Sequence, residues 1–153
     1  MTAELDVAVK EMEALFNAAW QANAAPFFGY VPAVEWYGKE TKDKVDRTKV
    51  WARFSTQNVF EEQATLSACV DEPFVRRWNG SGLIFVQLFL PKTVANAVIK
   101  GRQLAKVARN AYRGKKTDGG VTFFNVRIND NLEPEEQFYR INVVAEYDYD
   151  ELG

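Results

Sequence analysis

Apolar residues near the start of the chain recur every three or four positions. The repeating residues are Leu5, Val9, Met12, Phe16 and Ala19. This spacing predicts an amphipathic helix that buries one face, with Thr2 as its N-cap residue. Because proline disfavours the helical conformation in the residue before it, Pro26 predicts that the helix ends within residues 22–25.

Further along the chain, alternation of apolar and polar residues predicts strands. The expected strands are 33–37, 50–57, 64–70, 83–90, 122–128 and 138–149. The last of these alternates most regularly. The run 83–90 differs because it is apolar on both faces apart from Gln87, which is typical of a central strand covered on both sides. Helices would supply one cover, and a neighbouring subunit could supply the other.

A short segment with two glycines comes just before that run. Asn79 and Gly80 form a typical turn pair, and we expect a turn there that leads into the strand. Gly80–Gly82 precedes a strand instead of joining a strand to a helix. It is therefore interpreted as turn chemistry and not as a phosphate-binding loop.

A second helix is expected after Pro91, and Gly114 stands where a glycine commonly ends a helix. Its apolar stripe consists of Val94, Val98, Gly101, Ala105, Ala108 and Tyr112. The predicted order of elements is α-β-β-β-β-α-β-β, an α+β fold with a mixed or antiparallel sheet flanked by two helices. The length and the lack of a linker predict a single domain over residues 1–153.

The composition supplies material for one core, since 47% of the residues are hydrophobic and 14% are aromatic. No apolar run approaches the roughly eighteen residues that span a bilayer, so we expect no membrane partner. The acidic, amphipathic start is not typical of a signal peptide. Cys69 is the only cysteine, which excludes a disulfide within the chain.

The chain contains no histidine. This excludes His-dependent catalytic triads, Cys–His dyads and zinc sites that use His. The acidic end of the chain lacks the regular spacing and the glycine bend of a calcium loop. We therefore expect no catalytic residues, no metal and no cofactor. A carboxylate-based hydrolase is the enzyme class that stays open, and its candidate acids are Glu35, Glu61, Glu72 and Glu146.

Charge is distributed unevenly. Residues 92–116 contain eight basic and no acidic residues, whereas residues 129–153 contain eight acidic residues and one basic residue, Arg140. Such a division suits copies that join head to tail, or a charged partner, and it equally suits two solvated faces. The candidate contact residues are Arg102, Lys106, Arg109, Arg113, Lys115 and Lys116 on the basic side, and Glu133, Glu135, Glu136 and Asp148 on the acidic side.

Several stretches together resemble a known family. They are the strand Trp51-Ala52-Arg53-Phe54-Ser55, the pair Arg76-Arg77 before the glycine turn into GLIFVQLFLPK, the helix rich in Ala, Arg and Lys, and the terminal strand FYRINVVAEYDYD. Over residues 1–150 this arrangement resembles the tail-terminator-like proteins of long-tailed bacteriophages and of related phage-derived particles.

The resemblance implies a small α/β fold that assembles into a homo-oligomeric ring, typically of six copies, in the virion after assembly in the host cytoplasm. The ring would cap the head-proximal end of the tail tube, stop its polymerisation and provide a docking surface for the head–tail connector or neck protein. DNA would be passing cargo only. The alternatives are another neck or tail-completion protein, and a nucleic-acid-binding module that uses the basic helix within residues 92–116.

Overall fold

The computed structural model describes residues 2–39, 44–64, 76–130 and 133–152. Its elements are α1 (Leu5–Asn23), a short 3₁₀ helix (Ala25–Phe27), β1 (Ala33–Trp36), β2 (Trp51–Gln63), β3 (Arg77–Pro91), α2 (Ala97–Tyr112), β4 (Thr122–Asn129) and β5 (Phe138–Leu152). The five strands form one sheet in the order β1-β2-β3-β5-β4. β1 pairs with β2 in parallel, and the other neighbours are antiparallel.

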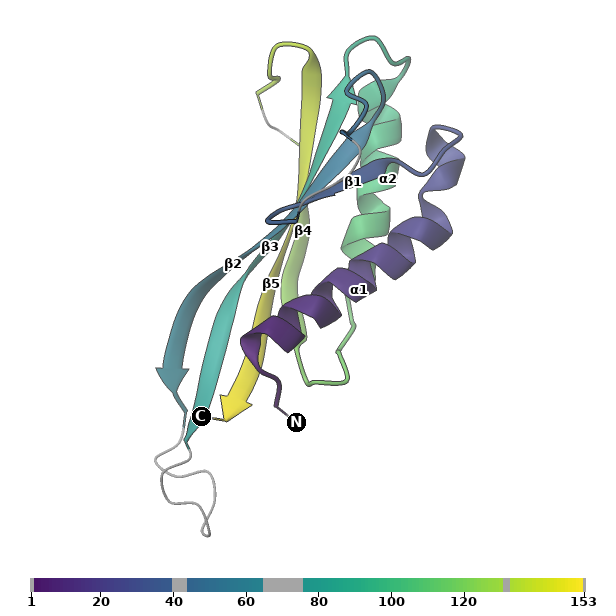
Figure 1. Ribbon diagram of the computed structural model, residues 1–153. Helices are drawn as coiled ribbons and strands as arrows, with labels where there is room; N and C mark the ends of the chain where they lie inside the picture. Colours follow the sequence, from purple (N-terminus) through teal and green to yellow (C-terminus); the bar gives the residue numbers. More distant parts are fainter. Residues whose placement is uncertain (1, 40–43, 65–75, 131–132, 153) are drawn as a thin grey trace.

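Both helices pack against the same side of the sheet (Figure 1). The α+β class with a mixed sheet and two helices is therefore confirmed, and the described elements follow the predicted order with one strand fewer between α1 and α2. The predicted strand 64–70 lies outside the described residues except for Ala64. The run 83–90 belongs to β3, which is the middle strand of the sheet as expected.

The core lies between the sheet and the helices. α1 contributes Ala8, Met12, Phe16 and Trp20, which are fully buried. Two buried polar hydrogens are satisfied by backbone carbonyls: the Trp20 indole donates to Pro32 O at 2.8 Å, and the Tyr112 hydroxyl donates to Met12 O at 2.7 Å. The second of these bonds joins the two helices directly.

The ends of the helices differ in part from the prediction. α1 is preceded by Glu4 as its N-cap residue, not Thr2, and no side chain caps it. α2 begins at Ala97, so Val94 lies before the helix. The N-cap residue of α2 is Asn96, whose backbone is in the left-handed conformation. Gly114 has a φ of 70°, as expected for the glycine after a helix.

The glycine segment Gly80–Gly82 is not a turn, contrary to the prediction. β3 begins at Arg77, and both glycines lie inside it, paired with Tyr149 and Tyr147 of β5. A Cβ atom at Gly80 or Gly82 would collide with the ring of the paired tyrosine. The glycines are therefore needed because each leaves room for an aromatic ring that lies across the neighbouring strand.

The two faces of the sheet have different surroundings. Ile84, Val86 and Leu88 of β3 point to the helices and are buried, while Leu83, Phe85 and Gln87 point the other way and are partly exposed. No described helix covers this second side, which we call the open face. The prediction that β3 is covered on both sides thus holds for one side within the described residues.

Candidate functional site

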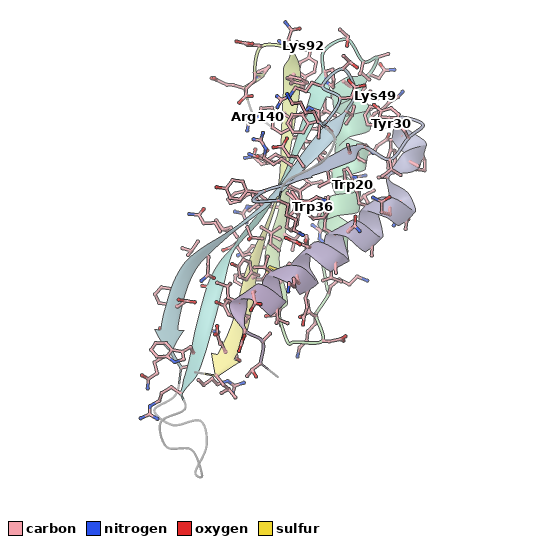
Figure 2. The ribbon with its side chains drawn as sticks, viewed as in Figure 1. Trp20, Tyr30, Trp36, Lys49, Lys92 and Arg140 are labelled. Carbon is pink, nitrogen blue, oxygen red and sulfur yellow. The ribbon has the colours of Figure 1, made fainter. Side chains whose placement is uncertain are left out.

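An arginine-rich pocket lies on the open face at the end of the sheet where β3 finishes. It is a cavity of about 110 Å3 lined by Arg47, Trp51, Arg53, Phe89, Glu135, Phe138 and Arg140. These residues come from the segment before β2, from three strands and from the β4–β5 loop. Arg140 lies on the side of the sheet away from the helices (Figure 2). We call this set the arginine pocket.

Stacked aromatic rings form the floor of the arginine pocket. Trp51 and Phe89 are direct cross-strand neighbours, with ring centroids 4.1 Å apart and an interplanar angle of 7°. Phe138 meets both rings edge-on. Trp51 is only 1% exposed and Phe89 5% exposed, so these rings are buried without a helix above them.

Three guanidinium groups cover the rings in place of a helix. Arg47 and Arg53 lie 5.1 and 5.5 Å from the Trp51 centroid. Arg53 and Arg140 lie 5.3 and 5.6 Å from the Phe89 centroid. These distances are within the range of cation–π attraction. The flat guanidinium groups therefore seal the aromatic floor and present positive charge to solvent.

The positive charge of the arginine pocket is only partly compensated. Arg53 pairs with Glu35 at 3.3 Å, and Arg140 pairs with Glu135 at 2.8 Å. Arg47 is exposed and has no carboxylate partner among the described residues. Two buried donors at the pocket, Trp51 Nε1 and Arg140 Nε, also have no hydrogen-bond acceptor within the described part of the chain.

Acidic side chains gather at the opposite end of the open face. Alternation along β5 places Asp148 and Asp150 on the same side of the sheet as Arg140. Asp150 pairs with Arg77 at 3.1 Å. Burial, Asp150 and Glu146 together raise the pKa of Asp148 above its usual value. The neighbours of Asp148 thus disfavour its charge, and no ion pair to it occurs in the described structure.

The predicted basic residues of α2 lie away from the open face. Arg102 pairs with Asp130 of the same chain at 2.7 Å. Arg113 donates to Val126 O at 3.4 Å, and Arg109 donates to Asn110 Oδ1 at 3.3 Å. Two of the six candidates therefore already contact β4 or the loop after it, which the charge pattern alone did not predict.

Lys106 and Lys115 border a groove between the two helices. This groove has a volume of about 690 Å3 and a mainly apolar lining that includes Leu15, Phe27 and Val107. Lys116 lies further on, where it forms an isolated bridge with Thr122 at the start of β4. The six basic candidates consequently do not form one continuous patch.

The predicted acidic residues are also divided. Glu133, Glu135 and Glu136 are exposed in the β4–β5 loop. Asp148 is paired with Thr122 at the other end of the β4–β5 hairpin. Asp148 is ten positions further along β5 than Phe138, the strand residue that follows the loop, a span of roughly 33 Å. Of the loop acids, the structure places Glu135 at the arginine pocket, and it places Asp148 far from that pocket.

The candidate acids of a hydrolase are placed apart in the described structure. Glu35 pairs with Arg53, Glu146 pairs with Arg127, and Glu61 accepts a hydrogen bond from the Tyr149 hydroxyl. Glu72 and Cys69 lie outside the described residues. Within the described residues no group of three possible metal ligands occurs, and no helix there is long and apolar enough to cross a membrane.

Sequence inspection missed the arginine pocket because its residues are far apart in the chain. A signal was present in part, since the alternation of β2 already places Trp51 and Arg53 on the same face. That Phe89 and Arg140 join them depends on the antiparallel pairing of β3 with β2 and with β5. That register could not be obtained from the strand patterns alone.

Comparison with known proteins gives little further information. No protein-family model matches the chain, and no curated protein matches it. One solved structure of another protein is similar over 90% of this chain and 94% of its own, with a TM-score of 0.48 and 14% sequence identity. This likeness is too distant to support an inference about function.

Proposed function

We propose that the protein is a structural assembly protein, not an enzyme, and that its copies join into a ring. In the form that the resemblance implies, the ring caps the head-proximal end of a phage tail tube, ends tube growth and offers a docking surface to the head or neck. The observation that carries the proposal is the open face of the sheet, where the apolar side chains of Leu83 and Phe85 on β3 have no described helix above them.

The exposed apolar residues support the same proposal. The ends of β2, β3 and β5 project beyond the helices (Figure 1), and there Val59 and Phe60 are 60% and 52% exposed. Trp78 and Leu152, on the adjoining strands, are also exposed. Exposed apolar side chains at one end of a sheet favour an interaction with another protein.

The distribution of charge favours self-association in the form of a closed ring. Positive charge at one end of the open face and negative charge at the other make complementary surfaces on one chain. Two different complementary surfaces generate a head-to-tail contact, which closes into a ring when the rotation between copies permits it. The contact partners in this scheme are other copies of the chain, then the tail tube protein and the connector or neck protein.

The proposal is tested by measuring assembly and its effect on tube growth. Light scattering after size-exclusion chromatography should give a mass that is a fixed multiple of 17.4 kDa, six times for the expected hexamer, and electron microscopy should show rings. Added to polymerising tail tube protein, the ring should shorten the tubes and lie at one end. A protein that stays monomeric at all concentrations, or that leaves tube length unchanged, would contradict the proposal.

A further inference from the structure

The chemistry of the arginine pocket matches a single carboxylate. Three guanidinium groups converge there, and only two carboxylates of the described chain, those of Glu35 and Glu135, pair with them. Arg47 is the exposed member and lacks such a partner in the described structure. A guanidinium group binds a carboxylate through two parallel N–H···O bonds, which gives both strength and orientation.

The same geometry disfavours a nucleic acid. Bases bind proteins by stacking on exposed aromatic faces, but the faces of Trp51 and Phe89 are buried and already covered by arginines. The cavity of about 110 Å3 admits a small group only. The carboxylates of Glu35 and Glu135 beside it would also repel a run of phosphates. A side chain that ends in one carboxylate satisfies all three conditions.

Asp148 is the carboxylate of the open face that most needs such a partner. It is partly exposed and forms no ion pair in the described structure, although Arg77 and Lys116 line the same shallow pocket. Burial, Asp150 and Glu146 disfavour its ionised form and raise its pKa. It lies eight positions further along β5 than Arg140, which corresponds to roughly 26 Å. The arginine pocket and Asp148 of one chain therefore cannot meet, although two copies can bring them together.

We propose that the open face is the surface through which copies of this chain associate, with the arginine pocket of one copy receiving Asp148 of the next. This inference deepens the proposed ring assembly and rests on it. Arg47 gains the carboxylate that it lacks within the described part of its own chain, and Asp148 gains an ion pair. Leu83, Phe85 and Gln87 lie between the two ends on the same face.

A charge-reversal cycle tests the contact. Arg47→Glu should weaken association about tenfold or more, because it places two carboxylates against each other. Asp148→Lys should do the same, because it places an ammonium group against the arginines. The double variant should recover most of the loss, since the two reversed charges then attract each other across the boundary between copies. The readout is the concentration dependence of mass in sedimentation experiments, with thermal melting as the check on folding.

The matched control is Lys44→Glu. Lys44 is exposed, lies three residues from Arg47 and does not line the arginine pocket, so the same change of charge should leave association unaltered. Arg47→Ala serves as a second variant should the reversed charge lower the melting temperature. It removes the guanidinium group without adding a negative charge and should weaken association to a smaller extent.

The outcomes separate this inference from the proposed function. A wild-type ring that Arg47→Glu leaves intact overturns the inference and leaves ring assembly standing. A wild-type dimer that the single variants disrupt and the double variant restores supports the contact but overturns the ring, because two open faces can also pair about a two-fold axis. A wild-type protein that is monomeric at every concentration overturns both.

Discussion

The helix side and the open face of the sheet use aromatic residues in different ways. On the helix side Phe16 stacks on Phe54 at 5.3 Å and meets Trp36 edge-on at 5.9 Å, and helix backbone closes the layer. On the open face Trp51 and Phe89 stack at 4.1 Å, and guanidinium groups close the layer. Both arrangements bury rings, but only the second leaves charge at the surface.

This difference indicates which side of the sheet can bind a partner without disturbing the core. A ring buried under a helix cannot be uncovered without unfolding the packing around it. An arginine that covers a ring keeps its charged end in water and can exchange one anionic partner for another at little cost. The helix side therefore maintains the fold, and the open face is suited to binding.

Truncating one phenylalanine on the helix side and one on the open face tests this difference most directly. Phe54→Ala should lower the free energy of unfolding by about 3–5 kcal/mol, because the residue is 2% exposed and surrounded by rings. Phe85→Ala should cost less, about 1 kcal/mol for a partly exposed side chain. Urea unfolding at a concentration where the protein is monomeric measures both.

Phe85→Ala should nevertheless weaken association more than Phe54→Ala does, when each is compared at equal folded fraction. This reversal of order is the informative result. Equal costs of unfolding for the two variants would show that the open face is packed as firmly as the helix side, and the contrast between the two faces would then be lost.

The substitution Gly82→Ala tests whether the stability of the sheet depends on the space that Gly82 leaves for the Tyr147 ring. Replacing a strand glycine by alanine ordinarily stabilises. Here the added Cβ would meet the Gln57 carbonyl oxygen and the Tyr147 ring, so Gly82→Ala should destabilise by about 1–3 kcal/mol. Ser81→Ala, one residue away and on the open face, is the control and should change the melting temperature little. A stabilised Gly82→Ala variant would contradict the close fit.

The basic residues Lys106 and Arg109 of α2 provide a comparison with the arginine pocket. Lys106→Glu combined with Arg109→Glu reverses two charges on the helix side. Because these residues lie away from the open face, association should change by about twofold at most. A loss as large as that caused by Arg47→Glu would place the α2 surface in the contact between copies. Raising the salt concentration should reduce whatever small effect remains, since exposed charges are screened.

The sequence predicts the helices and strands better than it predicts which residues of different strands lie next to each other. Periodicity finds α1, α2 and β5 because each buries one regular stripe. Periodicity fails at Gly80–Gly82, because each glycine is required by the ring of a tyrosine on β5, a strand near the other end of the chain. The same limit applies to the site: Arg47 and Arg140 are adjacent in space only because β2 and β5 flank β3.

The smallest expected effect concerns the acidic end of the open face. The pKa of Asp148 is raised, so the folded protein holds its ionised form less well than the unfolded chain does. In the isolated monomer Asp148→Asn should therefore stabilise at neutral pH, by no more than about 0.5 kcal/mol for a partly exposed group. The gain should fade as pH falls through the raised pKa and vanish below the unfolded value of 3.8, where both states are protonated. Thermal melting of the variant and the parent at several pH values measures this, and Asp118→Asn, at an exposed position, is the control. A loss of stability at neutral pH that disappears in acid would mean that a cation within its own chain stabilises Asp148, and the arginine pocket of a second copy would then have no unpaired carboxylate to receive.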